Sequence, residues 1–490
     1  MSFYKNACFN IEINFTRYGL VIDDYDIAIV GSGTSGGCLA YYLNKAGFHC
    51  LLVEAGRSFS ANTFPGNEMD YTTQLFWNGG MDVSMDGRLI FLRGKCLGGG
   101  SVINQCDLDR FDDIALLDWK EASGVTFFTN EGMIRHYEEV EKHLVIQEIP
   151  KNHWNRNARI FAEGFERLGF RWSPLARGQS DCAIEEGNDC IVCLGGCPRD
   201  SKQSVLVTFL KQAKRNGLEI WPEFETENIQ NIKEGVKIAG RRNGHYIEVF
   251  ARNCVLAAGA LGTTHLLLKS GYGEKLPSLG ERFFCHPQMM NFGVFDEKVN
   301  SHKGVLQAVK SDDIRIRKKG FKLENVFAPP ISLAMLVPGF GKKHQAWMQK
   351  YTHMACIEVA IRDVGKGKLT IDRRGKLKIN KVLSKEDQRR ARQGQKLVRE
   401  IFEAMHAKEI LQSNFMFGLH LMGGCAMGID PSSSIVDGNF KVHGCQNLFI
   451  ADSSIFPSAP GINPALTIMA LAHRASKAIT NAGRFHTDRQ

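Results

Sequence analysis

The chain has 490 residues, 43% of them hydrophobic and 23% charged, which is typical of a globular protein with more than one hydrophobic core. No apolar run reaches the ~18 residues of a membrane span, so we expect none. The net charge is only +9, and acidic residues are interleaved in the basic stretch 366–396, which argues against a nucleic-acid partner. Residues 1–26 lack the apolar core of a signal peptide, so we expect a cytoplasmic protein whose 14 cysteines stay reduced.

Residues 27–54 predict a strand, a helix and a second strand, in that order. Residues 27–30 form a short apolar run typical of a buried parallel strand. Residues 38–46 suit a helix, and residues 50–53 are a second apolar strand that ends at Glu54. The arrangement is a βαβ unit with all its parts in sequence.

The turn of this unit carries Gly31, Gly33 and Gly36 in the pattern G-x-G-x-x-G. Gly31 permits the tight turn, Gly33 lets the backbone approach a pyrophosphate, and Gly36 lets the helix pack close to the strand. Glu54 is placed to accept hydrogen bonds from a ribose, and its charge would repel a 2′-phosphate, which argues against NADP. We therefore predict a dinucleotide site; the alternative is a glycine-rich turn in an ordinary α/β unit.

A second glycine-rich segment lies at residues 92–104. Three consecutive glycines, Gly98 to Gly100, precede Ser101 and Asn104. Such a backbone suits close contact with a flat ligand or a phosphate. The alternative is a flexible surface loop, which the flanking apolar residues disfavour.

The middle of the chain predicts an insertion between two parts of one sheet. Helical periodicity is found at 131–144, 158–168 and 202–216, and strand patterns at 220–222, 229–232, 236–241 and 246–250. Residues 254–260 predict a buried strand that returns to the dinucleotide sheet, with a helix starting near Thr263. Alternating residues in 302–372 indicate an antiparallel sheet, followed by helices at 385–407 and 468–481.

Four cysteines gather between the two predicted helical regions, and we expect them to lie close together: Cys182, Cys190, Cys193 and Cys197. The spacing fits three interpretations. They could ligate an iron–sulphur cluster, bind a structural zinc, or simply pack or form disulfides in a loop over the substrate domain.

Four separate blocks of the chain resemble the glucose–methanol–choline (GMC) family of flavin oxidoreductases. They are the first glycine motif with Glu54, the segment 93–104, the segment 259–271, and the C-terminal segment from His420 to Asn463. The last block is most similar to the cholesterol oxidase branch. The stretch 279–287 is similar to a further family motif, with Arg282 and Cys285 as departures.

The resemblance implies FAD as the cofactor. Family members that bind FAD covalently use a His just before the position of Asn104; here that residue is Ile103, so we expect non-covalent binding. The implied cofactor-binding residues are Gly31, Gly33, Gly36, Glu54, Arg93, Gly98, Gly99, Ser101, Asn104, Ile229, Asp452 and Pro464.

The expected fold class is α/β, with a Rossmann-type FAD-binding domain interleaved with an α+β substrate domain built on an antiparallel sheet. We assign residues 22–110, 200–285 and 421–490 to the FAD-binding domain. Residues 111–199 and 286–420 form the substrate-binding domain, and 1–21 form an N-terminal extension.

His420 and Asn463 match the family's catalytic positions. Oxidising an alcohol moves a hydride to flavin N5 and removes the hydroxyl proton, so a neutral His suits a general base. An Asn amide can donate a hydrogen bond to the same oxygen without titrating. We expect His286 and His265 to have packing or supporting roles.

The leading prediction is therefore an FAD-dependent oxidoreductase for a primary or secondary alcohol, with oxygen or a redox protein as electron acceptor. One rival is a flavin dehydrogenase that passes electrons through the cysteine cluster to a partner. Others are a flavin-fold lyase or decarboxylase, and a non-catalytic flavin-binding protein. The C-terminal resemblance points to a bulky or apolar alcohol.

Overall fold

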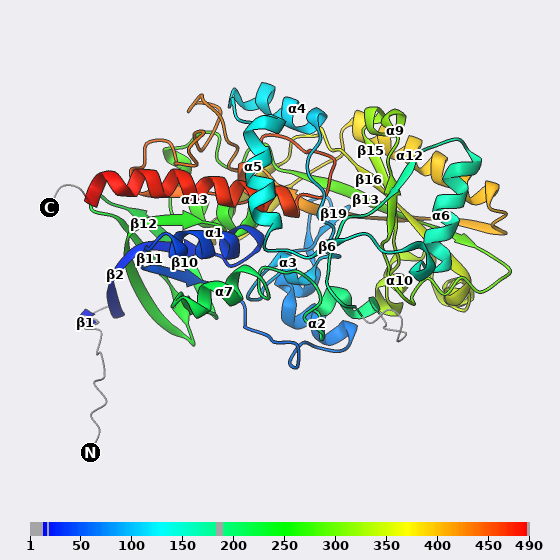
Figure 1. Cartoon of the computed structure of the whole chain (residues 1–490), viewed down its shortest axis with the longest axis horizontal. Coiled ribbons are helices and arrows are strands. Elements are labelled where there is room, and N and C mark those ends of the chain that lie inside the picture. Colours follow the sequence, from blue (N-terminus) through cyan, green and yellow to red (C-terminus); the bar gives the residue numbers. More distant parts are fainter. Residues whose placement is uncertain (1–12, 17–18, 183–189, 488–490) are drawn as a thin grey trace, which may run out of the picture.

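The computed structural model describes residues 13–16, 19–182 and 190–487. Two large β-sheets lie side by side along the long axis of the molecule, each covered by helices (Figure 1). The predicted α/β fold class is confirmed. The domain boundaries given above stay a prediction.

The first sheet has a parallel centre, in the order β20, β12, β2, β3, β9. Two strands extend it from β12 in antiparallel fashion, and β1 pairs antiparallel with the start of β2. The bounds are β1 Ile13–Thr16, β2 Gly19–Val30, β3 Cys50–Val53, β9 Glu219–Trp221, β10 Phe224–Asn231, β11 Val236–Arg242, β12 His245–Leu256 and β20 Leu448–Ile450.

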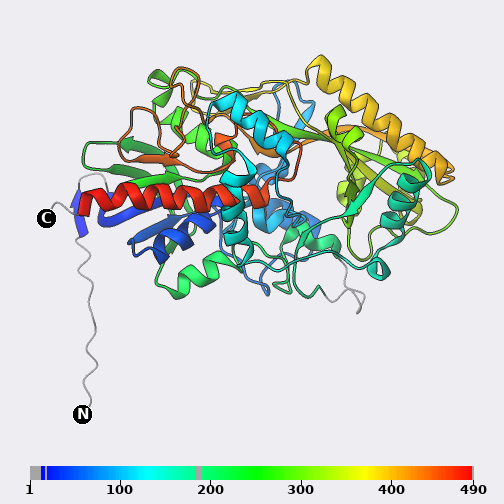
Figure 2. The same cartoon turned by 45° about the horizontal axis from the view of Figure 1, so that its top comes forward.

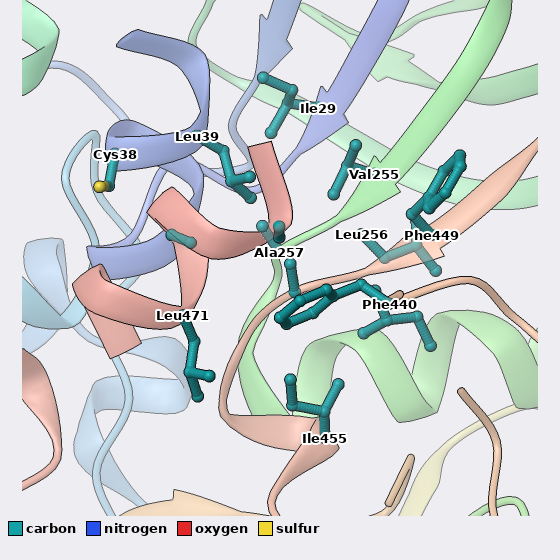
Figure 3. Packing of buried hydrophobic residues seen from close by; sticks show 14 of the residues in the cluster. Ile29, Cys38, Leu39, Val255, Leu256, Ala257, Phe440, Phe449, Ile455 and Leu471 are labelled. Atoms are coloured by element: carbon teal, nitrogen blue, oxygen red, sulfur yellow. The ribbon is translucent and has the colours of Figure 1, made fainter. Parts of the chain in front are cut away.

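The central strands are apolar without alternation because helices or other buried chain cover both of their faces. Helices α1 (Thr34–Lys45) and α13 (Ala465–Thr487) pack against each other on one face. Figure 3 shows Leu39 of α1 beside Ile29 and Val255 of the sheet, and Leu471 of α13 belongs to the same hydrophobic core. This packing holds the carboxyl ends of the strands in place.

The second sheet is mostly antiparallel, in the order β4, β5, β19, β13, β16, β15, β14, β7. Only the pairing of β5 with β19 is parallel. The bounds are β4 Asp82–Val83, β5 Leu89–Phe91, β7 Trp172–Pro174, β13 Phe284–Val294, β14 Val309–Ser311, β15 Phe321–Asn325, β16 Met354–Ile361 and β19 Glu409–Met422. Two small two-stranded sheets pair β6 Ile146–Gln147 with β8 Arg177–Gly178, and β17 Lys368–Ile371 with β18 Leu377–Asn380.

Helices cover one face of the second sheet and leave the other face to a cavity. Helices α6 (Arg156–Arg167) and α12 (Lys385–Ala404) pack on the residues of β15 and β16 that point to the outer face, and Figure 2 shows α12 along the outside of this sheet. Helix α10 (Pro330–Leu336) packs over part of the opposite face. Since side chains alternate along a strand, residues 288, 290 and 292 of β13 point to that inner face.

The remaining helices connect these layers. Their bounds are α2 Glu68–Leu75, α3 Gly100–Ile103, α4 Asp113–Ser123, α5 Asn130–Glu141, α6 Arg156–Arg167, α7 Phe209–Arg215, α8 Gly259–Lys269, α9 Ile314–Lys319, α10 Pro330–Leu336, α11 Gly341–Met348 and α12 Lys385–Ala404. Among the described residues, no helix has the length and apolar character needed to cross a membrane.

Two predicted regions differ from the structure. The helix expected over 202–216 is helical only in α7, because Lys202 is buried and donates to backbone carbonyls while the Val205 amide donates to Ser101 Oγ. The separate strands expected at 246–250 and 254–260 are replaced by one strand, β12, which stays paired with β2 through a register shift at Ala251. This strand ends at Leu256, and α8 already begins at Gly259 rather than near Thr263.

Candidate active site

A cavity of about 700 Å³ connects the two sheets. At one end it is lined by Gly31, Gly33 and Glu54, at the carboxyl edge of the parallel strands. At the other end it is lined by His420 and Asn463, against the inner face of the second sheet. The predicted nucleotide motif and the predicted catalytic pair therefore open into one space.

Close backbone packing determines the glycine turn. A Cβ on Gly31, whose φ is +97°, would lie 2.6 Å from the Ala257 carbonyl oxygen, and a Cβ on Gly36 would lie 1.8 Å from the Gly31 carbonyl oxygen. A Cβ on Gly33 would meet nothing within 4 Å. The turn thus leaves open space beside Gly33, at the N-terminus of α1, where backbone N–H groups favour an anion such as a pyrophosphate.

Glu54 links the two glycine-rich segments. Its carboxylate accepts hydrogen bonds from the Ser32 amide (3.0 Å), the Ser32 hydroxyl (2.7 Å) and the Gly56 amide (2.8 Å). The Gly98 amide donates in turn to Ser32 Oγ. Burial raises the pKa of Glu54, and these hydrogen bonds oppose that rise by favouring the charged form. The carboxylate lies at the cavity wall, where a ribose would meet it.

The predicted cofactor residues fall into two groups. Eight line the cavity: Gly31, Gly33, Glu54, Arg93, Gly99, Asn104, Asp452 and Pro464. Gly36, Gly98, Ser101 and Ile229 do not. Gly36 and Gly98 shape the turns, and Ser101 Oγ donates to the Gly98 carbonyl and accepts from the Val205 amide.

Ile229 does not line the cavity, and its role as a backbone contact to the cofactor stays a prediction. Its amide donates to Ser270 Oγ, and its side chain is buried in the core. The residues of β10 that line the cavity are Phe224 to Thr226. A register shift between Thr226 and Asn228 separates the two positions, and the sequence carries no signal for it.

Asp452 is anchored at the start of α8. One carboxylate oxygen accepts from the Gly259 amide (2.8 Å) and from Thr263 Oγ (2.5 Å), and the other accepts from the Ser454 amide (2.8 Å). Burial raises its pKa, and these donors oppose the rise. The three contacts keep this buried carboxyl in one position at the cavity wall.

A β-bulge orients His420. The pairs Phe284–Met422 and His286–Leu419 frame one extra residue on β19, and His420 lies within it with a φ of +54°. Positive φ is unusual for a residue other than glycine and is found preferentially at functional sites. The bulge therefore turns His420 toward the cavity, as bulges beside active sites commonly do.

His286, on the neighbouring strand, contacts His420 directly. The two Nδ1 atoms are 2.9 Å apart, and the Gly461 amide donates to His286 Nε2 at 3.0 Å. Burial lowers the pKa of both rings, that of His420 to about 3. Both histidines are therefore neutral at neutral pH.

Asn463 is held by three charged side chains. Its Oδ1 accepts from Lys322 Nζ at 2.8 Å, and its Nδ2 donates to Asp107 (3.1 Å) and to Glu324 (3.3 Å). The amide is thus fixed in position at the cavity wall.

These side chains belong to a buried cluster of charges. Lys322 forms an ion pair with Glu324, and Arg177 pairs with Asp107 at 3.1 Å. Burial raises the pKa of Asp107 to about 7. Burial also raises the pKa of Glu358 well above its usual range, helped by the neighbouring Glu324 charge and the hydrogen bond to Glu324. These effects favour the neutral, protonated form of Glu358.

The sequence prediction missed this cluster. Glu358 is the single charged residue in an otherwise apolar strand, residues 354–361. A lone acidic residue in such a strand is the one local sign of a buried polar site. Lys322 and Glu324 alternate along β15 and look like a solvent-exposed face. Only the pairing of β15 with β16 brings Lys322 and Glu324 next to Glu358.

Beyond the polar end, the cavity wall is apolar. It is formed by side chains of β13, α10 and the flanking segments: Met290, Phe292, Val326, Phe327, Leu336, Cys356 and Phe417. The cavity therefore combines a charged, hydrogen-bonded end with an apolar wall.

The described members of the cysteine motif contact different partners. Cys182 Sγ lies 3.0 Å from Ser201 Oγ, and the Cys193 thiol hydrogen-bonds Cys106. The side chain of Cys190 lies outside the described residues. In the described part of the chain, no group of three or more His, Cys, Asp or Glu could hold a metal ion. The predicted metal site at Cys182, Cys190, Cys193 and Cys197 stays a prediction without structural support.

A glycine-rich turn at the carboxyl edge of a parallel sheet, with a cavity leading to polar residues on a second sheet, defines a dinucleotide-dependent enzyme. Family models agree with this class. Residues 72–288 and 364–472 match the N- and C-terminal models of the GMC oxidoreductases, and residues 29–85 match an NAD(P)-binding Rossmann-like domain. The chain belongs to the GMC oxidoreductase family.

Relatives of known name span almost the whole chain. A long-chain-alcohol oxidase of Arabidopsis thaliana is 27% identical over 93% of this chain and 67% of its own length. A cholesterol oxidase of Mycobacterium tuberculosis (strain CDC 1551 / Oshkosh) is 23% identical, covering 95% of this chain and 93% of its own.

Solved structures share the fold. The pyridoxine 4-oxidase from Mesorbium loti matches with a TM-score of 0.73 at 18% identity, covering 95% of this chain and 100% of its own. A formate oxidase from Aspergillus oryzae RIB40 matches with a TM-score of 0.72 at 16% identity, over 96% and 100%.

The family implies FAD, and the residues fit it. The open space beside Gly33, the helix N-terminus that follows and the Glu54 carboxylate match the needs of a pyrophosphate and a ribose. The cavity continues from there past Asn104 and Asp452 to His420, so one elongated ligand can extend along it.

Proposed function

We propose that the protein is an FAD-dependent oxidoreductase that oxidises a primary or secondary alcohol to the carbonyl by hydride transfer to flavin N5. The observation that carries the proposal is the single cavity that joins the glycine turn to His420 and Asn463. Bound FAD supplies the hydride acceptor, and the chain supplies the positions of the alcohol oxygen and carbon. Ile103 offers no side-chain nucleophile, which supports non-covalent binding.

We propose an alcohol with an apolar chain as the substrate. The apolar wall formed by Met290, Phe292 and Phe417 would bury such a chain, at ~25 cal/mol for each Å² of apolar surface removed from water. The polar end at His420 would take the hydroxyl. The names of two relatives, a long-chain-alcohol oxidase and a cholesterol oxidase, support this substrate class.

His420 is the proposed contact to the hydroxyl oxygen. Asn463 already directs its two amide N–H groups to Asp107 and Glu324, so its predicted contact to the same oxygen stays a prediction. The sequence predicts that His420 is the general base, and that assignment stays a prediction. Its Nδ1 is engaged by His286, so Nε2 is the ring nitrogen that remains for a ligand in the cavity.

The test is flavin bleaching without oxygen. FAD-loaded protein is mixed with 1-alcohols of increasing chain length, a sterol, and a polar sugar as the control. We expect bleaching that becomes faster with chain length and is absent with the sugar. Reoxidation by air would identify an oxidase, whereas reoxidation only by a dye would indicate a redox partner. Conversion of an alcohol-containing substrate without bleaching would favour a lyase and contradict the proposal.

A further inference from the structure

His286 and His420 form a buried pair whose protons are fixed by the backbone. The Gly461 amide is a donor only, so His286 Nε2, 3.0 Å away, must be the acceptor and carries no proton. A cationic His286 would point an N–H at this amide, and burial disfavours that charge. Neutral His286 therefore carries its proton on Nδ1.

This proton determines the tautomer of His420. The two Nδ1 atoms are 2.9 Å apart, so His286 Nδ1–H donates and His420 Nδ1 accepts. A neutral imidazole has one proton, which in His420 must then be on Nε2. Since Nδ1 is occupied by His286, Nε2 is the nitrogen available to the cavity that His420 lines.

We propose that His286 is a positioning residue that, with the Gly461 amide, holds His420 in the Nε2–H tautomer, so that His420 meets a ligand oxygen as a hydrogen-bond donor. This proposal rests on the proposed function in one respect: the ligand oxygen is taken to be the hydroxyl oxygen of an alcohol. Taking a proton at Nε2 would require His420 to move its own proton to Nδ1, against the proton that His286 already directs there. The orientation thus conflicts with the general-base role predicted from sequence.

A donor at this place binds the oxygen and stabilises negative charge on it as the hydroxyl proton leaves. The cavity offers other acceptors for that proton. The carboxyl groups of Asp107 and Glu324 line the same cavity and contact Asn463. His420 and these carboxyl groups would then have complementary roles at one oxygen.

Two substitutions of His286 separate its two contacts. In His286→Asn, the Nδ2 amide can replace the Nδ1–H donor to His420, while the acceptor for Gly461 is lost. In His286→Gln, the longer side chain can accept from Gly461, while the donor to His420 is lost. Both variants remove the ring, so a packing role alone would affect them alike.

The direct readout is the tautomer itself. Histidine is labelled with ¹⁵N in the FAD-loaded protein, and His420→Gln identifies the His420 signals. We expect the wild type and His286→Asn to show a proton on Nε2 and none on Nδ1, and His286→Gln to show a mixture. A wild-type spectrum with the proton on Nδ1 of His420 would overturn the proposal and restore the general base.

Kinetics provide a second readout. Flavin reduction by the best alcohol should stay within a few-fold of wild type in His286→Asn and fall about 5- to 30-fold in His286→Gln, the weight of one hydrogen bond. Equal losses in both variants would contradict a tautomer-setting role. If no alcohol bleaches the flavin, the proposed function fails, while the spectrum still tests the tautomer.

Discussion

Replacing Lys322 by Met should destabilise the protein strongly, because the side chain neutralises a buried carboxylate. Lys322 pairs with Glu324, whose side chain is 1% exposed, and donates to Asn463 Oδ1. Met has a similar length and fits the stem of the Lys. After the substitution Glu324 keeps its hydrogen bonds with Gln307, Asn463 and Glu358 but has lost its charged partner.

Removing one partner of a buried ion pair costs ~3–5 kcal/mol in free energy of unfolding. Here the cost should lie toward the upper end of that range, since Asn463 also loses the donor to its Oδ1. The double variant Lys322→Met/Glu324→Gln leaves no unpaired charge and should recover most of the loss. An exposed pair provides the control: Lys396, 78% exposed, lies 3.7 Å from Glu400, and Lys396→Met should cost less than ~1 kcal/mol.

The assay is thermal unfolding of the FAD-loaded proteins, followed by circular dichroism and by flavin fluorescence. Because the chain has more than one core, midpoints are compared rather than converted to free energies. The reasoning would be refuted if Lys322→Met melted with wild type, or if the double variant melted below the single one.

Three further outcomes are expected. Acid or heat denaturation should release intact FAD into the supernatant because Ile103 occupies the linking position; yellow colour in the precipitate would contradict this. Gly33→Ala should fold but lose FAD, since the added Cβ meets only open space. Gly36→Ala should fail to fold, since its Cβ would lie 1.8 Å from a carbonyl oxygen. Expression yield, melting temperature and flavin absorbance test both expectations. Burial lowers the pKa of His136 to about 3 and of His473 to about 4. In the unfolded chain these two histidines bind a proton near pH ~6.5, whereas in the folded chain they stay neutral. The folded state is therefore destabilised relative to the unfolded state as the pH falls from ~6.5 toward 4. The melting temperature of His136→Gln should fall less than that of wild type between pH 7.5 and pH 5. An equal fall in both proteins would exclude His136 as a cause of the acid destabilisation.

Much of the dinucleotide sheet could be predicted because its signals are local. Residues 50–53 form β3 as expected, and the G-x-G-x-x-G motif begins directly after β2 and ends within the first turn of α1. A buried parallel strand is apolar whatever lies beside it, and the turn requires glycine for steric reasons that the sequence displays. The helix predicted over 202–216 is too long because a non-local contact overrides the local signal. Lys is a good helix former, but the buried Nζ of Lys202 donates to the carbonyls of Val102 and Asn104.

The substrate end could be predicted only where a motif marked it. His420 and Asn463 were found by resemblance, and the structure places both at the cavity. Their partners could not be found, because His286 meets His420 and Lys322 meets Asn463 over more than 130 residues of chain. The antiparallel pairing of β13 with β19 creates the first contact. The second contact arises because the loop before α13, which carries Asn463, packs against β15. No local pattern encodes either arrangement.

Charge balance explains how this end of the cavity holds so many ionisable groups. Burial favours the neutral form of Glu358, and the other two carboxyl groups each have a cationic partner: Arg177 for Asp107 and Lys322 for Glu324. The cluster is then neutral as a whole, which avoids the cost of an uncompensated buried charge. The pKa of Asp107, raised to about 7 by burial, lets the cluster gain or lose one proton near neutral pH. His420, whose pKa is lowered to about 3, keeps its single proton over that range. Of the groups around Asn463, the carboxyl cluster rather than the histidine is therefore the one that can change its protonation where the enzyme would work.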